Sequence, residues 1–154
     1  MGELTSDSVA ELRSTILIID DDPLTIALAT KVLSQAGHTA LGAVGSSEAV
    51  EMCDRHPGKI DLIMLDLVLY PPSVHLDSHN NVTPRIHGDK LLPILRLKRP
   101  LTRILLMSAM SQWTLGGRGM GHLVRQYPFL QKPLTAETLL QKTREVLGSP
   151  FPNR

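Results

Sequence analysis

Four groups of polar residues in this 154-residue chain have the types and order that phosphoryl chemistry requires. The aspartates at 20–22 stand together, and Asp66, Ser108 and Lys132 follow at intervals, each at the end of a short and mainly apolar segment. Crowded carboxylates repel one another and need a cation, and hard divalent metal ions take oxygen ligands of this kind. A serine hydroxyl and a lysine ammonium suit phosphoryl oxygens. Together these residues predict a site for metal-assisted phosphoryl transfer.

Asp66 is the best candidate for the reacting group. It stands alone at the end of a continuous apolar run, so we expect its side chain to point into a cleft. A carboxylate can act as a nucleophile and form an aspartyl phosphate. A bound Mg²⁺ ion would neutralise the charge that builds on the transferred group.

The chain alternates between short apolar runs and segments with helical spacing. The apolar runs predict strands at residues 16–19, 39–44, 60–65, 103–107 and 129–131. The other segments predict helices at residues 23–36, 46–56, 88–97, 111–126 and 135–147. This alternation is typical of a parallel sheet with helices on both faces, in which ligands bind beyond the carboxyl ends of the strands. The four polar groups would then meet at one edge of the sheet.

Three of the predicted helices have notable residues. Asp22 can cap the first, with Pro23 in its first turn and Gly37 after its end. Its inward face would comprise Leu24, Ala27, Leu28, Val32 and Leu33. In the third, Pro93 is an internal flaw unless it lies in the first turn. The fourth is the weakest helix because it contains Gly116, Gly117, Gly119 and Gly121.

The remaining segments lack a regular period. Residues 1–14 predict a flexible lead, and residues 148–154 a fraying tail. Residues 70–87 are rich in Pro, Ser, Asn and His and predict a long loop, of a kind that is usually functional or mobile. One domain over residues 15–147 remains, which suits the length of the chain.

Composition excludes several classes of protein. A hydrophobic content of 42% with 20% charged residues excludes disorder of the whole chain. The net charge of +1 offers no strong field to nucleic acid or to an anionic membrane, and no apolar run reaches the length of a membrane span. Residues 1–14 lack the apolar core of a signal peptide. A lone cysteine, Cys53, fits a reducing compartment and an inward helical position, so we expect a cytoplasmic protein.

Four motifs in order carry a family resemblance. They are Ile-Leu-Ile-Ile-Asp20-Asp21-Asp22-Pro23, Asp-Leu-Ile-Met-Leu-Asp66, Leu-Leu-Met-Ser108-Ala109 and Phe129-Leu-Gln-Lys132-Pro133. Over residues 15–147 the chain resembles the receiver domain of two-component response regulators. The resemblance implies a flavodoxin-like (βα)5 fold, a doubly wound parallel sheet of five strands in the order 2-1-3-4-5.

The resemblance implies a role for each matching residue. Asp66 matches the phosphoacceptor, and Lys132 matches the lysine that pairs with the phosphoryl group. The implied ligands of Mg²⁺ or Mn²⁺ are Asp20, Asp21 (the more direct of the pair), Asp66 and the backbone carbonyl of Val68. Ser108 matches the hydroxyl that turns to the phosphoryl group, Phe129 the aromatic that moves inward, and Pro133 a proline whose peptide bond is often cis.

The function implied is a phosphorylation-dependent signalling switch rather than an enzyme. A histidine kinase or a histidine phosphotransfer protein would donate the phosphoryl group to Asp66. Output would pass through protein contact, and the resemblance also allows a homodimer through the face formed by helix 4, strand 5 and helix 5. Val68 and Met110 flank the expected phosphoryl position, and neither can orient a water molecule. We therefore expect slow self-dephosphorylation, which Val68→Asn should accelerate.

The chain departs from the family pattern in three places. Leu69-Tyr70-Pro71-Pro72 stands where Met-Pro is usual, and the interval from Asp66 to Ser108 is about a dozen residues longer than the family norm. The glycine-rich stretch 116–121 lies where the signalling surface of the family is read. These departures concern the output partner and the kinetics rather than the acceptor chemistry.

Two other functions compete with the switch. A degenerate receiver would bind proteins without phosphorylation, although all the acids and the lysine are present. A phosphatase of the haloacid-dehalogenase type would use Asp20-x-Asp22, but Leu24 stands where Thr or Val is usual and no acidic pair follows Lys132.

Three further features of the sequence have simpler interpretations. The long loop contains four candidate metal ligands, His75, Asp77, His79 and His87. Their spacing is not that of a known zinc motif, which disfavours a metal cluster there. A run of basic residues comprises Arg96, Lys98, Arg99 and Arg103. A solvated helix end explains this run better than contact with DNA does. Trp113 could anchor a partner helix, but one aromatic is weak evidence.

Overall fold

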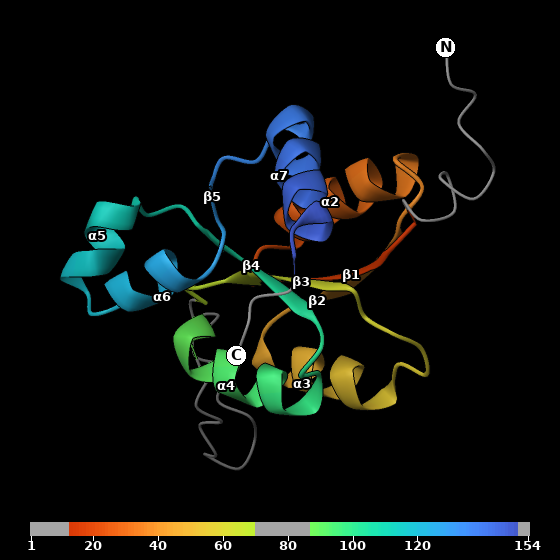
Figure 1. Cartoon of the computed structure of the whole chain (residues 1–154), viewed down its shortest axis with the longest axis horizontal. Helices are drawn as coiled ribbons and strands as arrows, with labels where there is room; N and C mark the ends of the chain where they lie inside the picture. The colour runs from red at the N-terminus through yellow and green to blue at the C-terminus, as the bar shows by residue number, and fades with distance from the viewer. Residues whose placement is uncertain (1–12, 70–86, 151–154) are drawn as a thin grey trace, which may run out of the picture.

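The computed structural model describes residues 13–69 and 87–150. Within these ranges five parallel strands form one sheet in the order β2-β1-β3-β4-β5 (Figure 1). The strands are β1 (Thr15–Ile19), β2 (Thr39–Ala43), β3 (Leu62–Asp66), β4 (Arg103–Ser108) and β5 (Phe129–Gln131). The expected flavodoxin-like sheet and its strand order are confirmed.

Helices cover both faces of this sheet. They are α2 (Pro23–Gln35), α3 (Ser46–Arg55), α4 (Gly88–Lys98), α5 (Gln112–Gly117), α6 (Gly121–Gln126) and α7 (Ala136–Gly148). In Figure 1, α2 and α7 lie on one side of the sheet, α3 and α4 lie on the other, and α5 and α6 lie beyond the edge near β5. In the part of the chain that the structure describes, no helix has both the length and the apolar character to cross a membrane.

The apolar strands contribute side chains to two hydrophobic cores, one on each face of the sheet, because successive residues of a strand point to opposite faces. In β1, Leu17 and Ile19 pack into the core shared with α3 and α4, whereas Ile16 and Ile18 pack into the core shared with α2 and α7. All four side chains are fully buried. Burial on both faces holds the strand ends, and the polar residues that follow them, in fixed positions.

The first helix begins as predicted but buries a different face. Asp22 caps α2 by accepting a hydrogen bond from the backbone N–H of Leu24 at 3.0 Å. The expectation that Leu24 and Leu28 face inward is wrong, since they are 78% and 41% exposed. The buried residues are Ala29, Val32 and Leu33. The helix lies on the sheet along a narrower stripe than the apolar spacing suggests.

The predicted single helix over residues 111–126 is also wrong, because the structure divides it. α5 ends at Gly117, and Gly119 adopts a φ of +82°, a left-handed conformation that glycine tolerates best. α6 begins at Gly121. Leu115 and Leu123 anchor the two short helices in the core on the α3 side. The division leaves most of the surface of α5 and α6 exposed.

Candidate functional site

Strand register brings the predicted polar residues to one edge of the sheet. Ile19 in β1 is level with Leu65 in β3, so Asp20, which follows β1, lies at the same height as Asp66, the last residue of β3. On the other side Asp66 is level with Met107 in β4, and Ser108 is level with Gln131 in β5. The parallel register therefore brings the carboxyl ends of β1, β3, β4 and β5, and the polar residues there, to one edge of the sheet.

Lys132 lies between two of the carboxylates. Its Nζ donates to Oδ2 of Asp20 at 2.5 Å and to Oδ2 of Asp66 at 2.9 Å. The Asp20 side chain is fully buried, and those of Asp66 and Lys132 are 5% and 16% exposed. The sequence pattern did not reveal the pairing of Lys132 with Asp20, since the two residues are 112 positions apart.

Asp21 completes a cluster of three carboxylates. Oxygen atoms of Asp20, Asp21 and Asp66 all lie within 4.8 Å of one another. One ammonium group faces three carboxylates, so the ionised cluster carries an excess of negative charge. Hard oxygen donors with excess negative charge suit a divalent cation such as Mg²⁺ or Mn²⁺. The residues present therefore fit the metal ion that the sequence implies.

Burial shifts the ionisation of the cluster. It raises the pKa of the Asp66 carboxyl to about 6, although Lys132 acts in the opposite direction. Burial also raises the pKa of Asp21, and the nearby Asp20 adds to this effect. Burial alone would lower the pKa of the Lys132 ammonium, but its hydrogen bonds and ion pairs with Asp20 and Asp66 raise it overall. Lys132 is therefore a permanent positive charge beside a carboxyl group whose pKa is raised.

Val68 and Gly88 shape the surroundings of Asp66. The backbone N–H of Val68 donates to Oδ1 of Asp66 at 3.0 Å, which leaves the lysine on the other carboxylate oxygen. A Cβ atom at Gly88 would lie 2.2 Å from the backbone carbonyl oxygen of Asp66, so only glycine fits there. Gly88 N–H donates to the carbonyl of Leu67 at 3.1 Å. The close packing of Gly88 against Asp66 was not predicted from the sequence, where its only signal is a glycine at the first position of a predicted helix.

Ser108 and Phe129 lie on the two strands beyond Asp66. Ser108 is fully buried, and its Oγ accepts a hydrogen bond from the backbone N–H of Met110 at 3.0 Å. The carbonyl of Ser108 accepts from Lys132 N–H at 2.8 Å, which ties the ends of β4 and β5 together. Phe129 is half-buried against the core on the α3 side. The peptide bond between Lys132 and Pro133 is cis.

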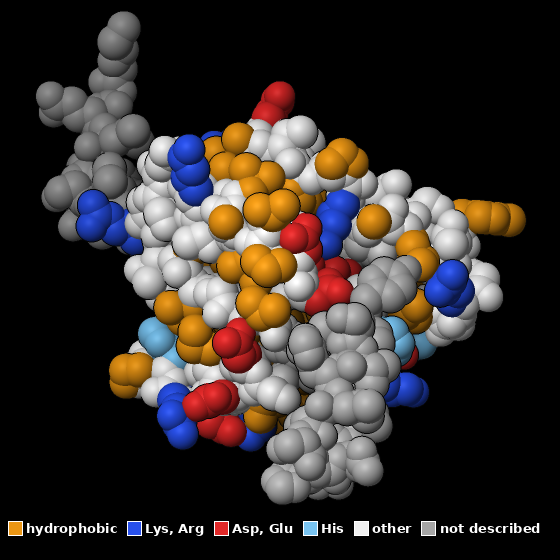
Figure 2. Space-filling model, turned by 180° about the vertical axis from the view of Figure 1, so that it is seen from behind, with side chains coloured by type: hydrophobic (Ala, Val, Ile, Leu, Met, Phe, Trp, Pro, Cys, Tyr) orange, Lys and Arg blue, Asp and Glu red, His pale blue; other side chains and the backbone are white. Residues whose placement is uncertain are grey.

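Acidic side chains are grouped near the middle of the face shown in Figure 2. Asp22 differs from its neighbours because its carboxylate caps α2 and accepts from Thr25 Oγ1 at 3.1 Å. Of the histidine group in the predicted loop, His87 is the residue preceding α4, whereas His75, Asp77 and His79 lie outside the described residues. The loop itself, over 70–86, also lies outside them.

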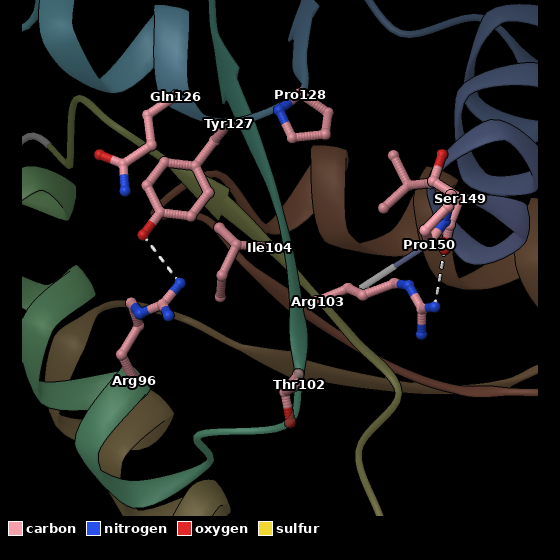
Figure 3. A pocket seen from close by; sticks show the side chains of 10 residues that line it. Arg96, Thr102, Arg103, Ile104, Gln126, Tyr127, Pro128, Ser149 and Pro150 are labelled. Atoms are coloured by element: carbon pink, nitrogen blue, oxygen red, sulfur yellow. Dashed lines mark hydrogen bonds between the residues drawn. The ribbon is translucent and has the colours of Figure 1, made fainter. Parts of the chain in front are cut away.

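The basic run makes structural contacts at the other end of the sheet. A cavity of about 170 Å³ there is flanked by Arg96 and Arg103 (Figure 3). Arg96 donates to the Tyr127 hydroxyl at 2.9 Å and lies 5.7 Å from the centre of its ring. Arg103 donates to the carbonyl of Ser149 at 2.9 Å. Lys98 and Arg99 contact groups of α3 and of the loop that follows it.

Comparison with known proteins rests on structure alone. No family model matches the chain, and no curated protein matches it significantly by sequence. A chemotaxis protein CheY4 of Vibrio cholerae superposes with a TM-score of 0.67 at 20% identity, over 87% of this chain and 98% of that one. A CheY-like response regulator receiver domain from Methanospirillum hungatei gives 0.68 at 20% identity, over 88% and 94%. A response regulator from Thermotoga maritima gives 0.65 at 20% identity, over 90% and 100%. The chain therefore has the fold of CheY-like response regulator receiver domains.

Proposed function

We propose that this chain is a phosphorylation-dependent signalling switch in which Asp66 accepts a phosphoryl group. One observation carries the proposal: Lys132 bridges Asp20 and Asp66 beside Asp21 on a receiver-type fold. The donor would be a histidine kinase or a histidine phosphotransfer protein, and output would pass to another protein. The lone free cysteine suits a cytoplasmic protein.

In the proposed transfer, a carboxylate oxygen of Asp66 attacks the phosphorus atom of a phosphohistidine. The phosphorus–nitrogen bond breaks, and the imidazole leaves with the electron pair and takes up a proton from water. The pKa of about 6 keeps most Asp66 ionised at neutral pH, as a nucleophile requires. Lys132 would move from the carboxylates to the incoming phosphoryl oxygens, which it neutralises as a point charge.

A divalent ion held by Asp20, Asp21, Asp66 and the Val68 carbonyl would supply charge neutralisation for the transferred group. Ser108 would exchange its hydrogen bond with Met110 for one to a phosphoryl oxygen, and Phe129 would move further inward. Such a local change biases an existing equilibrium between surface conformations. The surface affected comprises α5 and α6, which replace the predicted fourth helix, together with β5 and α7, and it is also the proposed homodimer face.

Intact-protein mass spectrometry after incubation with acetyl phosphate and MgCl₂ tests the acceptor. We expect one labile phosphoryl adduct on the wild type and none on Asp66→Asn. Asp22→Asn is the matched control, because asparagine also caps helices, and it should still acquire the adduct. Failure of the wild type to form the adduct, even with a phosphorylated histidine kinase, would instead favour a receiver that binds proteins without phosphorylation.

A further inference from the structure

The cavity flanked by Arg96 and Arg103 lies at the amino end of β4, whereas the carboxylate cluster lies at the carboxyl end of the sheet (Figure 3). We call it the amino-end cavity. Its volume is about 170 Å³. An apolar cavity of about 150 Å³ holds one benzene molecule, whereas drug-sized ligands and cofactors require roughly 300 Å³ or more. The volume therefore suits a ligand of about the size of one six-membered ring and excludes a nucleotide.

The walls of the amino-end cavity are mainly apolar. They come from β4, from the segment before β5, from α7 and from the residues after α7, and they include Ile104, Tyr127, Pro128, Val146 and Pro150. Among the described residues, no aspartate or glutamate lines the cavity. Such walls disfavour a ligand that is polar on all sides, such as inorganic phosphate, because it would lose its hydrogen bonds with water. Most of the ligand must therefore be apolar.

Two arginines give the amino-end cavity a positive charge. Arg96 donates to a neutral partner, the Tyr127 hydroxyl, and within the described ranges it forms no ion pair with a carboxylate. A guanidinium group has five N–H donors in a planar fork, so Arg96 retains donors for a second acceptor. Arg103 adds a second charge from the other side of β4 (Figure 3). A carboxylate is an anionic group that matches the planar fork of an arginine.

The edge of β4 supplies a further donor. β4 has six residues and β5 has three, and the two strands pair only from Leu106 onward. The N–H of Leu106 donates to the carbonyl of Pro128 at 2.9 Å. Pro128 has no N–H, so it cannot continue the ladder toward the amino end of β4. The part of β4 that lines the cavity therefore has an open edge.

Ile104 presents its backbone groups to that open edge. In a parallel ladder the backbone groups of successive residues point alternately to the two neighbouring strands. Arg103 N–H donates to the carbonyl of Asp61 on the β3 side, so the N–H of Ile104 faces the other side. In the described part of the chain it has no backbone partner there, and Ile104 is only 5% exposed. A buried N–H needs an acceptor, which an anion in the cavity can provide.

We propose that the amino-end cavity binds a small carboxylate with an apolar body of about the size of a phenyl ring. The carboxylate would accept hydrogen bonds from Arg96 and from the N–H of Ile104. The apolar body would lie against Pro128 and Val146. The cavity shares no residue with the carboxylate cluster, so this inference goes beyond the switch at Asp66.

Benzoate is the probe for this cavity, and NMR titration of the ¹⁵N-labelled full chain tests the proposal. We expect a saturable shift of the Ile104 amide resonance, with a dissociation constant of about 0.1–1 mM, as is ordinary for so small a ligand. Benzyl alcohol keeps the ring without the charge, and acetate keeps the charge without the ring. Each should bind at least about ten-fold more weakly than benzoate. Equal binding of the three probes, or no shift of the Ile104 amide, would overturn the proposal.

A substitution in the wall of the cavity tests the contribution of charge. Arg96→Gln should weaken benzoate binding by at least about ten-fold, because it removes the charged partner of the carboxylate. Arg125→Gln makes the same change at an exposed arginine of α6 that does not line the cavity, and it should leave the affinity unchanged. Unchanged affinity in Arg96→Gln with a native far-UV circular dichroism spectrum would refute the proposal. If Arg96→Gln fails to fold, the comparison of the three probes on the wild type decides the question.

Two further variants separate this proposal from its rivals. Asp66→Asn should bind benzoate as well as the wild type does, so failure of phosphorylation and failure of the cavity are distinguishable. Shifts confined to amides around Lys132 would place the anion at the carboxylate cluster and contradict the proposal. Phe151 follows Pro150 directly in the sequence, and Phe151→Ala should also leave the affinity unchanged. Much tighter binding in that variant would instead assign the cavity to the phenyl ring of Phe151.

Discussion

Two cations in this molecule each join oxygen atoms from distant parts of the chain, but the oxygens differ in charge. Lys132, at the carboxyl end of the sheet, contacts the carboxylates of Asp20 and Asp66. Arg99, at the amino end, donates to neutral backbone carbonyls, and at distances of 2.7 to 2.9 Å these belong to Cys53, Gly58 and His56. The first cluster carries more negative charge than its cation neutralises, whereas the second carries none.

This difference distinguishes the carboxylate cluster at Lys132, which is suited to chemistry, from the carbonyl contacts of Arg99, which have a structural role and are called the clamp below. The three carbonyls near Arg99 include those of the last turn and C-cap of α3, where a positive charge is favourable and no group is left in excess. The carboxylates near Lys132 repel one another and retain a demand for further positive charge. The first arrangement maximises stability, and the second keeps a requirement that a metal ion and a phosphoryl group can meet. Four predictions test this contrast, in order of expected effect.

The largest effect should follow Lys132→Met in metal-free buffer. Removal of Lys132 leaves the buried carboxylates of Asp20 and Asp66 without their ammonium partner, which should lower the free energy of unfolding by about 3 kcal/mol. Addition of MgCl₂ should restore part of that loss, since a divalent cation compensates for the lysine. Urea unfolding with and without the metal measures both effects. Lys31→Met is the control for removal of a lysine. An equal decrease in the free energy of unfolding in the two variants would show that the carboxylates do not depend on Lys132 for charge neutralisation.

Arg99→Ala should destabilise the fold by about 2 kcal/mol, because three carbonyls lose a charged donor. Magnesium should recover none of this loss, which distinguishes the clamp from the carboxylate cluster. Arg99→Lys should recover little, since an ammonium group cannot reproduce the planar fork of the guanidinium. Urea unfolding beside Arg55→Ala, which removes an exposed arginine of α3, isolates the effect. A loss no greater than that of the control would contradict the clamp.

Asp66→Asn should stabilise the metal-free protein at pH 7.5 by about 1–2 kcal/mol. The pKa of about 6 is above the ordinary value of 3.8, so the folded state binds the proton more tightly than the unfolded state. The protonated Asp66 carboxyl makes its whole contribution to the free energy of unfolding below about pH 4, and this contribution is lost as the pH rises through 6. The advantage of the variant should therefore grow between pH 4 and pH 7 in urea titrations with EDTA. A variant less stable than the wild type at pH 7.5 would show that the ion pair with Lys132 outweighs burial.

His38 provides the smallest effect, with the opposite sign, at the amino end of the sheet. Its Nδ1 accepts a hydrogen bond from Ser14 N–H at 3.2 Å, and burial lowers its pKa although Asp61 opposes the shift. A lowered pKa contributes stability above the ordinary value of 6.5 that is lost as the pH falls. We expect a loss of a few tenths of a kcal/mol on going from pH 7.5 to 5.5, since the side chain is only half-buried. His38→Gln should remove this pH dependence in thermal unfolding, and an unchanged dependence would assign it to another group.

The sequence predicted the sheet and the residues at its functional edge because both are encoded locally. The strands β1, β3 and β4 are short apolar runs buried on both faces, and a polar residue ends or follows each of them. Parallel alternation then brings Asp20, Asp66, Ser108 and Lys132 to one edge without further information. The four-motif resemblance rested on the same positions, and the structural neighbours agree with the fold it implied.

The errors occurred where local pattern and tertiary packing disagree. Leu24 and Leu28 match the helical spacing of an inward face, but contact with the sheet selects the stripe through Ala29, Val32 and Leu33. The glycines at 116–121 were recognised as a weakness of one helix, yet the position of the break depends on Leu115 and Leu123 both reaching the core. Neither outcome can be read from spacing alone, since it depends on which surface is covered.

The sequence by itself determined which residue types end each strand, and therefore that carboxylates, a hydroxyl and a lysine meet at one edge. Only the tertiary structure decided how these groups share their charges. Lys132 bridges Asp20 and Asp66, Val68 N–H takes the second oxygen of Asp66, and Asp22 leaves the cluster to cap α2. The physical reason is that the secondary structure of a segment follows largely from neighbouring residues, whereas the charge pairing depends on distances between residues that are 66 and 112 positions apart.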